Sequence, residues 1–176
     1  LKQTLMEDDS YLPFNRRDVP ALTKNARLEC AAPDAENLRN GLDRPIGEDD
    51  NGATVALNDA ISYVFDQPQA VSHVRIIFDS DLNRTTLPEC EARRQRNMLH
   101  NRPLNWPDGY VPKTVTKSFR VEGVRADGTV DVLIDERENH QRLYARDISG
   151  EYTAIRLIPT ETWGAEKCHL FSFDVR

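Results

Sequence analysis

Two groups of carboxylates in the sequence could bind a metal ion or transfer protons. Glu48, Asp49 and Asp50 are consecutive, and Asp79 and Asp81 are separated by one residue. Calcium and magnesium take oxygen ligands, and paired carboxylates can act as general acid and base. Neither group stands in the D-x-[DN]-x-[DN]-G pattern of a calcium-binding loop. We therefore interpret both groups as solvated loops and predict no metal site.

The four histidines stand in no recognised catalytic motif. The sequence contains no G-x-S-x-G, no H-E-x-x-H and no P-loop. His73 and His169 fall in or beside segments with strand character, so we expect them to be packing or edge residues. His100 and His140 fall in polar loops, where they could contact a ligand.

Arginine and aromatic residues are concentrated between residues 93 and 110, where four arginines precede Trp106 and Tyr110. Arginine beside aromatic rings can hold a sugar, a phosphate or the carboxylates of a partner. We expect contact with a neighbouring domain or subunit first, a small ligand second and nucleic acid last. The predicted domain-contact residues are Arg93, Arg94, Arg96 and Arg102.

The remaining candidates lie at the ends of predicted strands. A strand that ends near Phe78 leads into Asn83 and Arg84. Asn139 and Arg142 belong to a second polar loop, where an arginine can satisfy backbone carbonyls, so a structural role is the favoured interpretation of this pair. Arg142 is kept as a candidate beside the other loop residues. The predicted ligand-binding residues are Asn83, Arg84, Trp106, Tyr110, His140 and Arg142.

Length and charge limit the classes of protein that fit. A chain of 176 residues can form one domain with a substantial core. The formal net charge of −6, with both signs interspersed, argues against general binding of nucleic acid. No apolar run approaches the roughly 18 residues that a membrane span requires. The sequence leaves the compartment open.

The three cysteines, Cys30, Cys90 and Cys168, are far apart, and no C-x-x-C pair occurs. This spacing argues against a structural zinc site. We interpret all three as ordinary thiols. The alternative is one disulfide with a spare cysteine, and it would join Cys30 to Cys168, because the first and last strands of closed sandwiches often lie side by side.

Alternating apolar residues predict at least six short strands. The "RADGTV" segment contains Asp127-Gly128, a dipeptide typical of a tight hairpin. Pro68 is interpreted as a turn between two strands. The absence of helix–strand alternation favours an antiparallel sandwich. The predicted strands cover residues 25–32, 61–66, 74–79, 119–124, 130–134, 153–157 and 171–175.

The segments between these strands are predicted to be irregular. Residues 33–57 are rich in Gly, Asn and Asp and are interpreted as a structured loop. Residues 85–113 contain four prolines and are interpreted as a long irregular insertion. Asp18 is predicted to cap a short helix that follows Pro20. We assign residues 1–27 to a lead-in segment and residues 28–176 to the β-sandwich domain.

Four segments together resemble a galactose-binding-like domain, the discoidin or F5/8 type C-like jelly-roll β-sandwich. They are "AENLRNGLDRP", "ISYVFDQPQAVSHVRIIFDSDLNR", "SFRVEGVRADGTVDVLIDERENHQRLYARDI" and "YTAIRLIPTETWGAEKCHLFSFDVR". More narrowly, "MEDDSYLPFNRRDVPALTKNARLECAA" and "RRQRNMLHNRPLNWP" resemble the segment and the insertion that accompany such a C-terminal sandwich in certain bacterial FAD-dependent oxidoreductases.

The resemblance implies a non-catalytic module that binds carbohydrate or packs on a neighbouring domain. FAD would be bound upstream, and this chain contains no G-x-G-x-x-G fingerprint and no cofactor of its own. Relatives that bind structural calcium use an Asp-Gly loop and a glutamate in the last strand. This sequence has Asn40-Gly41 and Ser172 at those places, which argues against calcium.

Three functional hypotheses follow. The leading one is an accessory domain that docks on the oxidoreductase domain of the same chain and presents a carbohydrate site. The alternative is an independent carbohydrate-binding module of a secreted or surface protein. The third is a hydrolase that uses the carboxylates at Asp79 and Asp81 or at Glu48 and Asp49, and it is the least favoured because no nucleophile stands beside a base.

Overall fold

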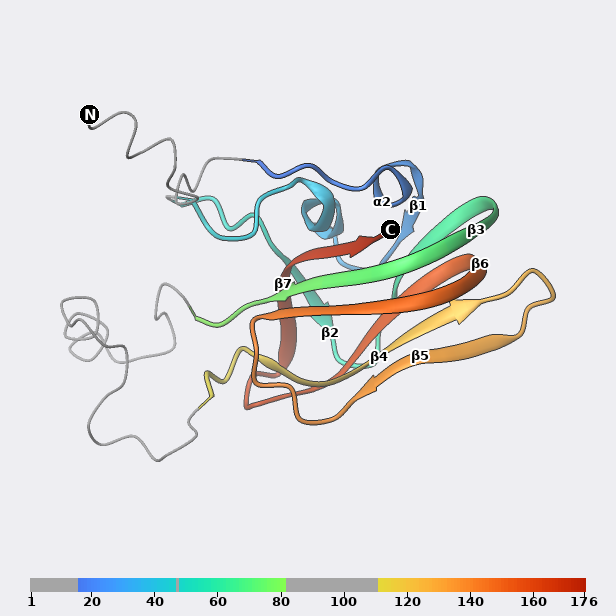
Figure 1. The fold of residues 1–176 in the computed structure, drawn as a ribbon. Helices are drawn as coiled ribbons and strands as arrows, with labels where there is room; N and C mark the ends of the chain where they lie inside the picture. The colour runs from blue at the N-terminus through green and yellow to red at the C-terminus, as the bar shows by residue number, and fades with distance from the viewer. Residues whose placement is uncertain (1–15, 47, 82–110) are drawn as a thin grey trace, which may run out of the picture.

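The computed structural model describes residues 16–46, 48–81 and 111–176 (Figure 1). No helix in these residues is long and apolar enough to cross a membrane. Two short helical segments and seven strands follow one another in the described residues. They are α2 (Ala21–Asn25), β1 (Arg27–Glu29), the 3₁₀ helix η1 (Ala35–Arg39), β2 (Ala53–Ala56), β3 (Ile61–Phe78), β4 (Thr116–Val124), β5 (Val130–Glu136), β6 (Leu143–Thr162) and β7 (Lys167–Val175).

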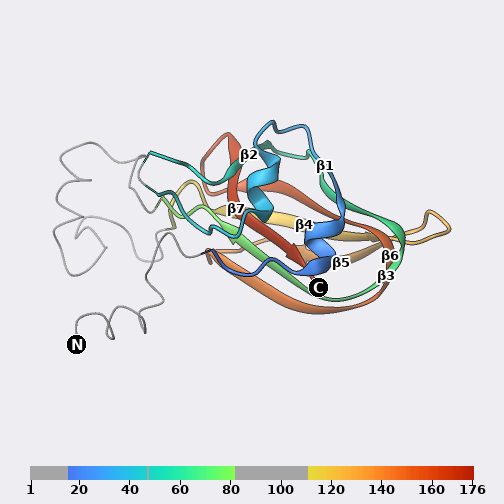
Figure 2. The same ribbon diagram turned by 90° about the horizontal axis from the view of Figure 1, so that it is seen from above.

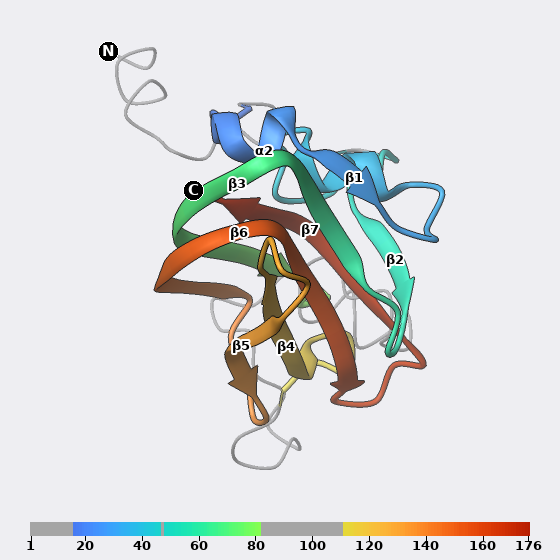
Figure 3. The ribbon, with the colours of Figure 1, turned by 90° about the vertical axis from the view of Figure 1, so that its right-hand side faces the viewer.

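The strands form two packed layers. Every pair of hydrogen-bonded neighbouring strands is antiparallel. One layer contains β2, β7, the second half of β3 and the first half of β6. The other contains β1, the first half of β3, the second half of β6, β4 and β5. Figure 3 shows β3 and β6 arching together from one layer into the other. The predicted antiparallel β-sandwich is therefore confirmed.

The prediction of two strands separated by a turn at Pro68 is wrong, because β3 runs without interruption for 18 residues. The ladder with β6 is broken between Val64 and Gln69. Proline has no N–H to donate to a ladder, and unpaired residues let a strand bend sharply. Pro68 therefore marks the point where β3 bends from one layer into the other.

Three further segments differ from their predictions. The loop predicted over residues 33–57 contains η1 and β2. β6 begins at Leu143, inside a segment interpreted as a polar loop. The short lead-in helix is confirmed as α2. Its N-cap residue is Pro20 and no side chain caps its first turn, so the prediction that Asp18 caps this helix is wrong.

The tight hairpin between β4 and β5 is confirmed. Gly128 has a φ of 84° and its N–H donates to the carbonyl of Arg125 over 3.0 Å. Positive φ is the conformation that glycine adopts without steric cost. The dipeptide Asp127-Gly128 thus fixes the register of the two strands.

Aromatic side chains join the two layers in the core. The ring of Phe119, on β4, lies 5.0 Å from that of Phe78 and 4.8 Å from that of Tyr144 in the other layer. Tyr63 stacks on Phe173 at 5.0 Å, and its hydroxyl donates to the Phe173 carbonyl over 2.9 Å. The largest fully buried side chains are Tyr63, Phe78, Phe119, Tyr152, Phe171, Phe173, Leu38, Ile61, Ile76, Ile155, Leu157 and Leu170.

The described part of the lead-in packs on the first layer, and α2 and η1 lie beside β7 (Figure 2). Thr23 is fully buried, and its hydroxyl bonds both the N–H and the carbonyl of Val175, over 2.7 and 2.9 Å. β2 pairs only with the first part of β7. At the end of β7, where β2 no longer pairs with it, the Thr23 side chain supplies hydrogen bonds to the β7 backbone. The boundary between residues 27 and 28 stays a prediction.

Cys30 and Cys168 are free thiols, so the alternative of a disulfide between them is wrong. Cys168 is buried, and its sulfur lies 3.0 Å from the Thr116 hydroxyl. Burial raises the pKa of Cys168 to about 12. This thiol therefore stays protonated and acts as a core side chain. Cys90 lies outside the described residues.

Candidate functional site

Two of the six predicted ligand-binding residues can be placed. Arg142 lies just before β6, and His140 is exposed in the same loop and bonds to no described residue. The other four, Asn83, Arg84, Trp106 and Tyr110, lie outside the described residues. So do the predicted domain-contact residues Arg93, Arg94, Arg96 and Arg102. All these assignments stay predictions.

A histidine held between two carboxylates lies where β3 ends. Nδ1 of His169 is 3.1 Å from Asp79, and its Nε2 is 3.0 Å from Asp50. The His169 and Asp79 side chains are 19% and 16% exposed, whereas that of Asp50 is 57% exposed. We call Asp50, Asp79, Arg142 and His169 the rim cluster. It is a polar, partly open surface at one end of the sandwich.

Three segments distant in sequence bring the rim cluster together. His169 lies on β7, and Asp79 follows β3 directly, with its N–H donating to the His169 carbonyl over 3.0 Å. The loop before β2 carries Asp50 across the imidazole. A Cβ at Gly52 would lie 2.5 Å from Nε2 of His169, so only glycine lets the loop pass this closely.

His169 is positioned to be charged. Both ring nitrogens face carboxylate oxygens, which only accept hydrogen bonds, and only the imidazolium donates from both nitrogens. Burial lowers the pKa of His169, but the bonds and charges of Asp79 and Asp50 outweigh burial, and the net shift is upward. The rim cluster therefore presents a fixed positive ring flanked by two negative groups.

The charged His169 should stabilise the fold in a pH-dependent way. Its folded pKa is raised above the ordinary value of 6.5, so its contribution is complete below 6.5 and is lost as pH rises through the folded pKa. We expect His169→Gln to lower the free energy of unfolding more at about pH 5.5 than at about pH 8.5. Urea denaturation of both proteins at the two pH values measures this. A difference that is constant, or that grows toward the higher pH, would contradict the assignment.

Arg142 and the histidine both lie against the ring of Phe171. Its guanidinium carbon is 5.6 Å from the centre of the Phe171 ring, which in turn lies 4.9 Å from the His169 ring. Its Nη2 donates to the backbone carbonyl of Asp43, whereas its buried Nε has no hydrogen-bond partner among the described residues. Burial lowers the pKa of Arg142, and the charge of Asp43 opposes that effect. The Nε of Arg142 is therefore a buried donor without a partner among the described residues, and it faces the protein interior rather than the surface.

A network of ion pairs holds Asp43 in place beneath Arg142. The Asp43 carboxylate lies 2.6 Å from Arg75 and 3.0 Å from Arg17. The same two arginines bind Asp174, at 3.3 and 2.7 Å. Burial raises the pKa of Asp43, but the bonds from Arg75 and Arg17 outweigh it and leave that pKa below its ordinary value. This network fixes the backbone to which Arg142 bonds.

The rim cluster offers donors and acceptors rather than a nucleophile. Among the described residues no hydroxyl or thiol bonds to His169, whose partners are the two carboxylates. The described residues also contain no group of three or more His, Cys, Asp or Glu side chains that could hold a metal ion. Carboxylates that accept and a guanidinium that donates can bind vicinal hydroxyl groups of a polar ligand.

The sequence interpretation gave His169 only a packing or edge role. Its strand position favours that role, and its partners are 90 and 119 residues away in sequence. The structural role of Asn139 is confirmed, because its side chain bonds the carbonyls of Thr116 and Gln141 over 2.8 and 3.0 Å. Its own carbonyl accepts from the indole of Trp163 over 2.6 Å.

The architecture identifies the chain's fold as the galactose-binding-like β-sandwich of carbohydrate-binding modules. The chain resembles the family 32 carbohydrate-binding module of Streptococcus pneumoniae EndoD, with a TM-score of 0.61, 12% identity and coverage of 88% of this chain and 97% of that one. No model of a known protein family matches the sequence. No curated protein matches it either.

Two further solved structures share the fold. One is chitosan-binding module 1 of a Paenibacillus chitosanase/glucanase, with a TM-score of 0.57, 10% identity and coverage of 88% of this chain and 97% of that one. The other is the family 32 module of Clostridium perfringens NanJ in complex with galactose, with a TM-score of 0.56, 8% identity and coverage of 88% and 95%. At such low identities the similarity establishes the fold.

Proposed function

We propose that this domain is a non-catalytic carbohydrate-binding module and that the rim cluster contacts the sugar. The observation that carries the proposal is His169 held between Asp50 and Asp79, with the guanidinium of Arg142 over the neighbouring Phe171 ring, on a fold shared with sugar-binding modules. Sugar hydroxyls both donate and accept hydrogen bonds, so they match a surface that offers carboxylates and a guanidinium.

Fold similarity supports the class of function and does not supply a ligand. The solved structures include modules that bind galactose and chitosan. Trp106 and Tyr110 stay predicted contributors, because an aromatic face packs against the C–H face of a sugar ring. The proposal thus assigns hydroxyl recognition to the rim cluster, and it leaves the aromatic contribution to residues outside the described part of the chain.

Titration calorimetry with galactose, with N-acetylgalactosamine-β-1,3-galactose and with chitosan oligosaccharides tests the proposal. We expect Asp50→Asn to weaken sugar binding about 10-fold, because hydrogen bonds to a charged group contribute about 1.5–3 kcal/mol. Asp147→Asn is the matched control, since Asp147 also pairs with a histidine, His73, over 2.7 Å but is 95% exposed and outside the rim cluster. Equal affinity of the two variants would remove the rim from the site, and no binding by the unchanged protein would overturn the proposal.

A second candidate is an accessory domain of a bacterial FAD-dependent oxidoreductase. It is supported by the resemblance of the lead-in segment and of the arginine-rich insertion to those proteins, and the fold similarity favours the first candidate over it. The FAD site would lie in the oxidoreductase domain, so this chain purified by itself should carry no flavin absorbance. Bound flavin would contradict the upstream location of that site.

A further inference from the structure

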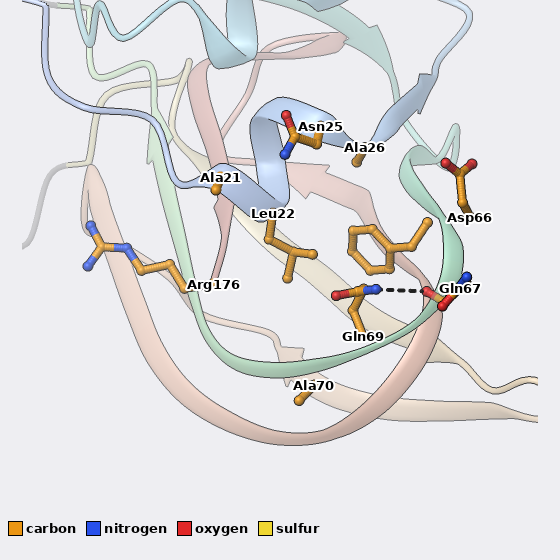
Figure 4. A pocket seen from close by; sticks show the side chains of 10 residues that line it. Ala21, Leu22, Asn25, Ala26, Asp66, Gln67, Gln69, Ala70 and Arg176 are labelled. Carbon is orange, nitrogen blue, oxygen red and sulfur yellow. Dashed lines mark hydrogen bonds between the residues drawn. The ribbon is translucent and has the colours of Figure 1, made fainter.

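A pocket of about 480 Å³ lies between α2 and the bend of β3 (Figure 4). We call it the bend pocket. Its volume falls within the roughly 300–1,000 Å³ of small-molecule sites. The second half of β3 runs from this bend to the rim cluster, and strands rise about 3.3 Å per residue, so the two places are about 30 Å apart along the strand. The bend pocket is therefore separate from the rim cluster.

The floor of the bend pocket is apolar. Leu22 projects from α2 toward the centre of the pocket (Figure 4), and Phe65 and Ala70 line it from β3. Phe65 is only 8% exposed and belongs to the core, so the floor is held by the packing of the sandwich. A fixed apolar floor can receive the C–H face of a ring without rearrangement.

Neutral amides surround that floor. The side chains of Asn25 and Gln67 form no hydrogen bond with any described residue. The Gln69 side chain makes one weak bond, from Nε2 to the Gln67 carbonyl over 3.3 Å. Each side-chain amide carries two donor hydrogens and an acceptor oxygen. The bend pocket thus gathers donors and acceptors that the protein itself leaves almost unused.

The backbone of the bend adds to this polar wall. Residues 65–68 have no partner residue on β6, because the register moves from Val64 opposite Ala154 to Gln69 opposite Tyr152. Bulged strands occur preferentially beside binding and active sites, where they redirect side chains. Here Gln67 lies in the bulge and Gln69 follows it, and both line the bend pocket.

The charges around the bend pocket favour a neutral ligand. Asp66 and Arg176 both line it, and they lie on different sides of the view in Figure 4. Arg176 is anchored through its backbone, which donates to the His73 carbonyl over 2.9 Å. One carboxylate and one guanidinium leave no excess charge, so an ionic ligand gains little there.

We infer that the bend pocket is a second saccharide site, in which Leu22 and Phe65 take the apolar face of a neutral sugar and Asn25, Gln67 and Gln69 bond its hydroxyls. The inference rests on the proposed carbohydrate-binding function. Two sites about 30 Å apart along β3 would let one domain hold two points of a glycan or two glycan chains, so affinity for polymers exceeds that for single sugars.

The test is a titration of ¹⁵N-labelled protein with galactose, with N-acetylgalactosamine-β-1,3-galactose and with chitosan oligosaccharides, followed by backbone amide shifts. We expect shifts in two groups, one around Asp79 and His169 and one around residues 21–26 and 65–70.

Two variants test the bend pocket directly. Ala70→Trp fills the bend pocket from an exposed strand position, and Gln69→Ala removes one amide. Each should weaken binding at the second group, Ala70→Trp at least 10-fold, and leave the rim unchanged. Ala126→Trp, in the exposed β4–β5 turn, is the matched control.

The outcomes separate the two proposals. Shifts at the rim alone would overturn the second site and leave the carbohydrate-binding function standing. Shifts at the bend alone, lost in Ala70→Trp and kept in Ala126→Trp, would support the second site and remove the rim from sugar recognition. No shifts with any of the sugars would overturn both.

Discussion

Replacement of Phe119 by alanine is expected to lower the free energy of unfolding by about 4 kcal/mol, as for other fully buried phenylalanines. Phe119 is 0% exposed and touches two aromatic rings, those of Phe78 and Tyr144, that belong to the opposite layer. Its removal leaves a cavity between the layers that rigid strands on both sides cannot close. Chemical denaturation followed by tryptophan fluorescence measures the loss.

The control for this experiment is Leu143→Ala, which shortens an apolar side chain that is 49% exposed at the start of β6. Exposed substitutions of this kind change stability by no more than about 0.5 kcal/mol. A loss at Phe119 as small as that at Leu143 would mean that the two layers do not depend on this aromatic contact.

Replacement of Arg75 by methionine is expected to lower the free energy of unfolding by about 3 kcal/mol, because it leaves buried carboxylates with too few partners. Asp174 is 2% exposed, and burial already raises its pKa despite the two guanidiniums beside it. Without Arg75, Asp43 and Asp174 would share Arg17 alone. Methionine keeps much of the side-chain volume, so the measured loss reports the charge.

Arg120→Met is the matched control for Arg75→Met. Arg120 also lies on a strand and faces a carboxylate, that of Glu122, but at 3.6 Å and with its side chain 45% exposed. Exposed ion pairs contribute about 0–1 kcal/mol. Losses of equal size in the two variants would show that the network around Asp174 is no stronger than a surface pair.

The sequence predicted those strands in which apolar residues recur at every second position. Ile61, Tyr63 and Phe65 occupy every second position, and all three are buried in the core. The same reasoning failed at Pro68, since a proline ends a strand or bends it according to what lies on the neighbouring strand. It also failed at the start of β6, where Tyr144 is buried but no regular alternation marks the segment.

The rim cluster was beyond prediction for a different reason. Asp50, Asp79 and His169 come from three separate segments, and the carboxylates were noted only in their own local clusters. Their meeting depends on the pairing of β7 with both β2 and β3, which no local pattern specifies. Residue type and loop position predict Arg142 as a candidate, and in the structure it shares the neighbour Phe171 with His169. Its part in ligand binding stays a prediction.

The unpaired residues at the bend of β3 make the fold tolerant of changes in the number of residues at that place. Residues 65–68 face no partner on β6, between the paired residues Val64 and Gln69. Elsewhere in a strand, adding one residue would turn every following side chain to the other face. At this bend an insertion or deletion of a residue can be absorbed without moving the core. Evolution or a designer could therefore reshape the wall beside α2 while the sandwich stays unchanged.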